Sequence, residues 1–112
     1  MRYERIARKA LKSAIGREKV CAITSKKGRI CGIGINKYTK SHPEQERFAR
    51  RAKQPERIYL HAEIDALIRS FPKPDTIHVY RVNNKGMFLN SKPCPVCELD
   101  IKEAGIKYVF HS

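Results

Sequence analysis

The chain has 112 residues, enough for one small domain, which we expect to span residues 1–112. No apolar run approaches the roughly 18 to 20 residues that cross a bilayer. The first fifteen residues mix charged with aliphatic side chains where a signal peptide would have an apolar core. These features argue against membrane and secreted classes, so we expect a soluble, cytoplasmic protein. The four cysteines then favour metal binding or reduced thiols over disulfides.

The charge of the chain is strongly positive and unevenly distributed. There are 24 Lys and Arg against 11 Asp and Glu, a net charge of +13. Residues 1–60 hold 17 basic and 5 acidic side chains, a net of +12, whereas residues 61–112 are close to neutral. Such a surface either serves solubility alone or attracts phosphate groups of a nucleotide or a polynucleotide. The sequence leaves both interpretations open.

The first part of the chain predicts a helix and a hairpin. Apolar residues recur at helical spacing over residues 2–15. Residues 19–38 contain two short apolar runs on either side of a Lys-Gly turn, which predicts a β-hairpin. A turn centred on that dipeptide would pair Thr24 with Cys31.

The middle of the chain predicts a basic surface excursion over residues 38–57, with two prolines and a short helical stretch between them. A helix then follows from residue 60 and ends before Pro72, because proline cannot continue it. The remaining elements are a strand over 76–82, a turn with a short extension over 83–90, a helix entered through the loop at 93–97, and a strand over 106–110. Strands that alternate with helices favour parallel pairing, so we predict an α/β fold with a mixed sheet of about four strands.

Two short motifs carry residues that suit metal chemistry. His61 and Glu63 open one predicted helix, and Cys94 and Cys97 form a Cys-x-x-Cys loop that opens the next. A helix N-terminus favours deprotonated thiols, and sulfur combined with imidazole selects zinc. Three protein ligands leave a fourth tetrahedral position open, which is typical of catalytic zinc. We therefore predict that His61, Cys94 and Cys97 bind Zn²⁺.

Glu63 follows the predicted ligand His61 by two residues in the same first turn. Two thiolates and a neutral imidazole bring the formal charge of the zinc site close to zero, so the metal needs a base beside it to activate water. We predict that Glu63 is this base and that it transfers protons rather than binding the metal.

With these residues the chain resembles the zinc-dependent cytidine and deoxycytidylate deaminases, together with the tRNA adenosine and polynucleotide cytosine deaminases that share their fold. The signature of zinc deaminases is H-x-E followed by P-C-x-x-C, and it is matched in order by His61, Glu63, Pro93, Cys94 and Cys97. The order of strands and helices is also similar over almost the whole chain. The resemblance implies a three-layer α/β/α fold and a zinc cofactor.

The resemblance also implies hydrolytic deamination of cytosine to uracil, in which Glu63 protonates ring N3 and then passes a proton to the departing amino group. It implies that Asn36 contacts the sugar and that the backbone N–H of Ala62 contacts the base. From the residues alone, Asn36 could equally be a turn former at the end of a strand.

The sequence departs from the family pattern in two ways. Asn90 stands where many relatives have threonine, which puts the rim of the pocket in doubt. The chain also ends soon after the predicted fourth strand, so we expect a free sheet edge and a homo-oligomer.

Several other residues are weaker candidates. Asp65 could orient the His61 ring, although an acidic residue is also simply favourable in a first helical turn. Cys21 and Cys31 are expected to be small buried apolar residues. The other histidines are more typical of surface or strand positions than of ligands: His42, His78 and His111.

The sequence leaves the substrate open. A deoxycytidylate-like nucleotide is our first expectation, and cytosine or adenosine in single-stranded DNA or RNA is the alternative, with nucleic acid bound through the basic N-terminal half. A different class is a zinc-stabilised nucleic-acid-binding module without catalysis, which would have no need of Glu63.

Overall fold

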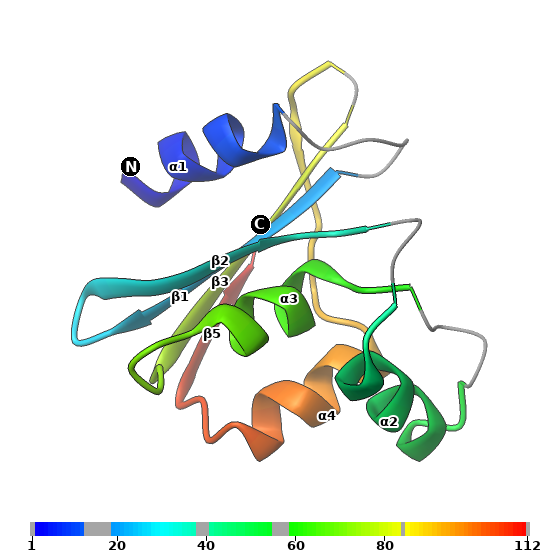
Figure 1. The fold of residues 1–112 in the computed structure, drawn as a ribbon. Helices are drawn as coiled ribbons and strands as arrows, with labels where there is room; N and C mark the ends of the chain where they lie inside the picture. The colour runs from blue at the N-terminus through cyan, green and yellow to red at the C-terminus, as the bar shows by residue number, and fades with distance from the viewer. Residues whose placement is uncertain (1, 13–18, 38–40, 55–58, 84, 112) are drawn as a thin grey trace.

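The computed structural model describes residues 2–12, 19–37, 41–54, 59–83 and 85–111 (Figure 1). In chain order the elements are α1 (Arg2–Leu11), β1 (Lys19–Lys26), β2 (Arg29–Ile35), α2 (Pro43–Arg51), α3 (Ala62–Arg69), β3 (Thr76–Val82), β4 (Phe88–Leu89), α4 (Pro95–Glu103) and β5 (Tyr108–His111). Among the described residues, no helix has the length and apolar character needed to cross a membrane.

The strands form one mixed sheet with β1 and β3 at its centre. β2 pairs with β1, and β1 pairs with β3, both in antiparallel orientation. The other edge of β3 is shared by two strands, since β5 runs parallel to its first half and β4 runs antiparallel to its last two residues. The predicted parallel pairing is therefore confirmed for β3 and β5. The four longer strands match the expected number, and the two-residue β4 adds a fifth.

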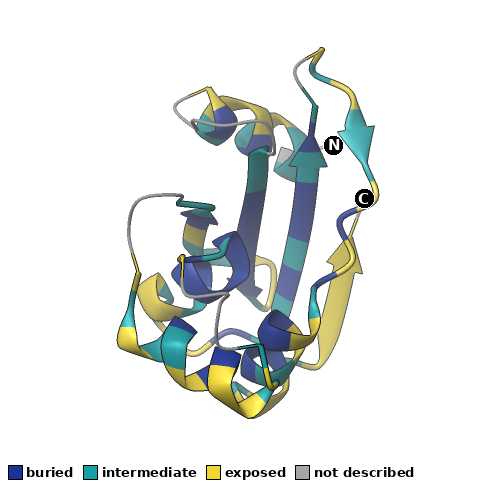
Figure 2. Ribbon diagram, turned by 90° about the vertical axis from the view of Figure 1, so that its right-hand side faces the viewer, coloured by how far each residue is buried: buried dark blue, intermediate teal, exposed yellow. Residues whose placement is uncertain are grey.

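Helices cover both faces of this sheet, which gives the expected three-layer α/β/α arrangement (Figure 1). On one face α1 packs through Ala7 and Leu11 against buried side chains of β1 and β3. On the other face α3 and α4 pack against the same two strands, and α2 lies against α4. The central strands are mostly buried, whereas β5 is exposed along its length (Figure 2).

The position of α3 depends on two glycines of β2. A Cβ atom on Gly34 would overlap backbone atoms of Ala62 and Ala66, and a Cβ on Gly32 would lie 2.7 Å from the Ala66 carbonyl oxygen. Only glycine permits so close an approach of strand and helix. This contact brings the start of α3, where the site residues lie, next to the end of β2.

The hairpin register differs from the prediction at one place. A β-bulge shifts the pairing between Thr24 and Ser25, so that Thr24 pairs with Gly32 and Ser25 with Ile30. The predicted pair of Thr24 with Cys31 is therefore wrong, because the extra residue of a bulge has no direct partner on the opposite strand. Cys21 is buried as expected, but Cys31 is only partly buried.

The predicted surface excursion is wrong for α2. Its basic residues are exposed, but Gln45, Phe48 and Ala49 are completely buried. Phe48 and Ala49 pack in one cluster with residues of α3 and α4, including Ile64 and Cys97. A narrow buried face on a mostly charged helix is enough to anchor it, because a single phenylalanine buries a large apolar area.

Candidate metal centre and active site

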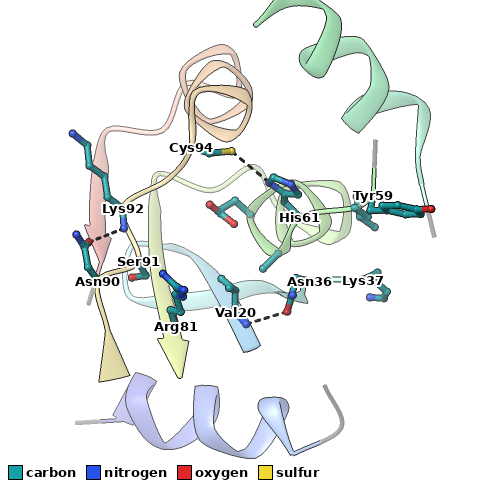
Figure 3. Close-up of a pocket in the computed structure, with 13 residues that line it drawn as sticks. Val20, Asn36, Lys37, Tyr59, His61, Arg81, Asn90, Ser91, Lys92 and Cys94 are labelled. Atoms are coloured by element: carbon teal, nitrogen blue, oxygen red, sulfur yellow. Dashed lines mark hydrogen bonds between the residues drawn. The ribbon is translucent and has the colours of Figure 1, made fainter. Parts of the chain in front are cut away.

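The predicted metal ligands lie at the starts of two helices that meet on one side of the sheet. His61 is the N-cap residue of α3, and Cys94 is the N-cap residue of α4. Neither side chain makes a capping hydrogen bond to its own helix. Pro95 occupies the first turn of α4, where proline is favourable because its missing N–H would have no helical partner. The His61 and Cys94 side chains therefore face each other (Figure 3).

The donor atoms of the three predicted ligands converge. The Nδ1 atom of His61 lies 3.2 Å from the Sγ atom of Cys97 and 3.5 Å from the Sγ atom of Cys94. All three donor atoms lie within 4.8 Å of one another, and within the described ranges this is the one group of such side chains arranged so that it could hold a metal ion. One imidazole nitrogen and two sulfurs form a donor set that suits zinc.

The two thiols respond differently to their surroundings. A hydrogen bond with Cys97, supported by one with His61, lowers the pKa of Cys94 to about 3. Hydrogen bonding to Cys94, together with burial, raises the pKa of Cys97 well above its ordinary value. A thiolate at Cys94 is therefore available at neutral pH, which favours capture of a cation.

Glu63 lies beside this group in the first turn of α3, and its side chain interacts with Cys97. Glu63 is only 6% exposed, and burial raises the pKa of its carboxyl group. A buried carboxyl with a raised pKa is suited to accepting and releasing a proton.

A cavity of about 410 Å³ opens beside these residues (Figure 3). His61, Glu63 and Cys94 contribute to its wall, and Asn36 and Ala62, the predicted substrate contacts, line it as well. The structure therefore brings all the predicted site residues except Cys97 to the cavity wall, and Cys97 is buried with its Sγ atom 3.2 Å from the Nδ1 atom of His61. The size suits a pyrimidine nucleotide.

Asn36 directly follows the last residue of β2 and also lines the cavity. Its backbone N–H donates to the Val20 carbonyl, and its side-chain Oδ1 atom accepts a hydrogen bond from the Val20 N–H at 3.0 Å. The residue thus ends the pairing of β2 with β1 and at the same time lines the cavity.

Asp65 does not orient the His61 ring. Its Oδ2 atom accepts hydrogen bonds from the Ile35 N–H at 3.2 Å and from the Lys37 Nζ atom at 3.0 Å, and its Oδ1 atom accepts from the Arg69 Nε atom at 3.0 Å. The suggestion that it acts on the ring is wrong although the two residues are four positions apart on one helix face, because both carboxylate oxygens bond to other groups. Asp65 instead joins α3 to the end of β2.

Sequence reasoning missed Gln45 and the position of three cations around the cavity, although one of them, Lys37, lies in the basic half that was expected to attract phosphate. The buried Gln45 side chain accepts a hydrogen bond from the His61 N–H through its Oε1 atom at 3.1 Å. The cations come from separate parts of the chain and are Lys37, Arg81 and Lys92. Neither feature has a sequence signal, because each depends on contacts between distant segments.

The loop before Cys94 forms part of the rim. The buried Ser91 hydroxyl donates a hydrogen bond to the Val79 carbonyl at 2.6 Å, which attaches the loop to β3. Asn90 accepts a hydrogen bond from the Lys92 N–H at 3.1 Å and is exposed at the rim. Asn90 thus shapes the turn that leads into the Cys-x-x-Cys motif.

Comparisons with known proteins agree with this arrangement. A protein-family model described as MafB19-like deaminase matches residues 2–112. Among solved structures, a dCMP deaminase from the cyanophage S-TIM5, in its apo form, is similar with a TM-score of 0.56 and 24% sequence identity, over 98% of this chain and 82% of that one. No curated protein matches the chain.

Proposed function

Because the chain belongs to the MafB19-like deaminase family, we propose that it is a zinc-dependent hydrolytic deaminase that converts cytosine to uracil in a nucleotide such as dCMP. The observation that carries this proposal is the buried Glu63 carboxyl beside the convergent donor atoms of His61, Cys94 and Cys97, at the wall of a cavity of nucleotide size. A site with only a structural role would not need that carboxyl group.

The zinc ion would be held by His61, Cys94 and Cys97. When bound, it would act as a Lewis acid that activates water for attack on the ring. Glu63 accepts a proton from the water and delivers it to ring N3. It then transfers the second proton to the amino group, which leaves as ammonia. One water and one cytosine thus give one uracil and one ammonia, and the glutamate returns to its initial state.

Two residues would orient the substrate in the cavity. The Asn36 side chain lies at the end of β2 and is held in place by Val20, so it can contact the sugar without first being ordered. Ala62 is the first residue of α3 and stands between His61 and Glu63 in the sequence. Its backbone N–H would contact the pyrimidine ring. Both contacts place C4 near Glu63.

The cations around the cavity support a substrate that carries phosphate. Lys37 lines the cavity from the residues just after β2, Arg81 lines it from β3, and Lys92 lies on the loop that leads to Cys94. Charge-assisted contacts with a phosphate are roughly twice as strong as neutral hydrogen bonds. A nucleotide would therefore bind better than the corresponding nucleoside.

A second candidate substrate is a cytosine within single-stranded DNA or RNA. The observation that favours it is Tyr59, which lines the cavity and is 52% exposed. Exposed aromatic side chains beside a nucleobase pocket can stack on the neighbouring base of a strand. A free nucleotide has no such neighbour.

The test is to incubate zinc-loaded protein separately with dCMP, deoxycytidine, a cytosine-containing oligonucleotide and an adenosine-containing RNA. Release of ammonia and conversion of the base are measured for each. We expect dCMP to be converted to dUMP, faster than deoxycytidine is converted. Conversion of the oligonucleotide alone would select the second candidate, and tight zinc binding without conversion of any substrate would indicate a binding module.

A further inference from the structure

Helix α2 lies against both helices that carry the predicted ligands (Figure 1). Its buried Phe48 and Ala49 belong to the same apolar cluster as Ile64 of α3 and Cys97 of α4. A residue of α2 can therefore act on the site although it is far from the motif in sequence. The residue best placed to do so is Gln45.

Gln45 is completely buried, and its Oε1 atom accepts the backbone N–H of His61 at 3.1 Å. His61 is an N-cap residue, and the N–H of such a residue has no acceptor within its own helix. The Gln45 amide supplies that acceptor. It therefore fixes the backbone from which the imidazole ring projects toward Cys97.

Gln45 is itself held on a well-attached element. The start of α2 is capped by His42, whose Nδ1 atom accepts the Glu44 N–H at 3.0 Å. Further along, Arg51 and Arg47 pair with Glu103 of α4 at 2.8 and 3.4 Å. The ion pairs link α2 to α4, the helix whose start carries both cysteines, so α2 contacts both the backbone of His61 and the helix of Cys94 and Cys97.

We propose that Gln45 is a positioning residue for the metal centre, and that α2 sets the position of His61 relative to Cys94 and Cys97 through it. The inference rests on the proposed function in assigning these three residues as ligands. Hydrogen bonds around a metal site hold the ligand residues in position. Loss of such a hydrogen bond typically lowers metal affinity by about 10- to 100-fold.

The test replaces Gln45 in three ways. Gln45→Leu keeps most of the volume and removes the acceptor, whereas Gln45→Glu keeps an acceptor of the same length. Gln45→Asn keeps the amide but is one methylene shorter, so it serves if the leucine variant does not fold. The matched control is Gln54→Leu, a glutamine in the same segment whose Oε1 atom has no hydrogen-bond partner among the described residues.

Two measurements do not depend on turnover, namely the zinc dissociation constant in competition with a chelator and the ligand-field absorption spectrum of the Co²⁺-loaded protein. We expect Gln45→Leu, or Gln45→Asn, to weaken zinc binding by about 10- to 100-fold and to change the Co²⁺ spectrum. Gln45→Glu and Gln54→Leu should remain close to the wild type.

Different failures have different meanings. Wild-type affinity and spectrum in a folded Gln45→Leu or Gln45→Asn variant would overturn the positioning role. Equal losses in Gln45→Leu and Gln45→Glu would also overturn it, because the hydrogen bond would then not be responsible. If the wild-type protein itself bound neither zinc nor cobalt, the proposed function would fail instead.

Discussion

Two acidic residues near the start of α3 have separate tasks although only one residue lies between them. Glu63 lines the cavity beside the ligand group, whereas Asp65 points to the end of β2 and bonds Lys37 and Arg69. The H-x-E motif predicts the position of Glu63 at the site from the sequence. The role of Asp65 depends on where β2 lies, which no local pattern reveals.

Replacement of Glu63 tests the proton-transfer role. Glu63→Ala should keep the fold and the bound zinc but lower turnover of dCMP by about 10²- to 10⁴-fold, because a positioned acid or base contributes that much. Zinc content and the rate of ammonia release are measured together. Glu98→Ala, an exposed glutamate in the first turn of α4, is the control and should keep full activity. Near-normal turnover in Glu63→Ala would refute the proposed mechanism.

Replacement of Asp65 separates a structural role from a role at the metal. Asp65→Asn weakens the bonds to Lys37 and Arg69, so the free energy of unfolding should fall by about 1–3 kcal/mol, the usual cost of disturbing a buried, hydrogen-bonded charge. Urea denaturation of the metal-free protein gives this value. Zinc affinity should stay within about threefold, since Asp65 has no bond to the ring. A large loss of zinc affinity at unchanged stability would show that Asp65 acts on the ring after all.

At the scale of elements, the motifs of α3 and α4 could be predicted because their signals are local: a donor residue at each helix start and a proline after the cysteine. The burial of α2 could not, because its few apolar residues stand among exposed charges and its partner is remote in sequence. The bulge after Thr24 could not be predicted either, and for β4 the sequence predicted only a short extension within residues 83–90, since bulges and two-residue strands depend on how neighbouring strands pair. The Gln45 contact has no pattern at all.

The interface between α2 and α4 also contains a buried acid. Asp100 of α4 is nearly inaccessible, and its Oδ2 atom has no hydrogen-bond partner among the described residues. Burial raises the pKa of Asp100 from 3.8 to about 7, and repulsion from Glu44 and Glu103 acts in the same direction. The attraction of Arg47 only partly offsets these effects. The folded protein therefore keeps this proton at a pH where the unfolded chain has lost it.

This raised pKa predicts the direction of a pH effect on stability. The contribution of Asp100 to the free energy of unfolding is most favourable below about pH 4. It falls as the pH rises toward about 7 and is constant above that. Asp100→Asn removes the titration, so it should be more stable than the wild type above pH 7 by on the order of 1 to 4 kcal/mol and nearly equal to it at pH 4. Urea denaturation of both metal-free proteins between pH 4 and 8 measures the difference. A difference that did not change with pH would contradict the raised pKa.

Across the whole molecule, the positive charge of residues 1–60 is less available than its sum suggests. Arg47 and Arg51 of α2 pair with Glu103 and lie over the Phe48 ring at 4.4 and 5.2 Å. These arginines attach α2 to α4. Among the described residues, the cations that line the cavity are Lys37, Arg81 and Lys92, and one of these, Lys37, already pairs with Asp65. Few of the described basic residues of this half therefore line the cavity.

This count predicts how binding responds to salt. Each phosphate of a single strand that pairs with a cation contributes a slope of about −0.7 to the logarithm of affinity against the logarithm of salt concentration. We expect a shallow slope of about −1 for dCMP, and only weak binding of single-stranded DNA with a similarly shallow slope, because few of the described cations line the cavity. The titration uses Glu63→Ala protein loaded with zinc, so that the substrate survives. As a control, Arg47→Ala combined with Arg51→Ala should leave dCMP affinity unchanged, whereas Arg81→Ala should weaken it. Tight strand binding with a slope steeper than about −3 would require at least four phosphate contacts and would make the polynucleotide the substrate.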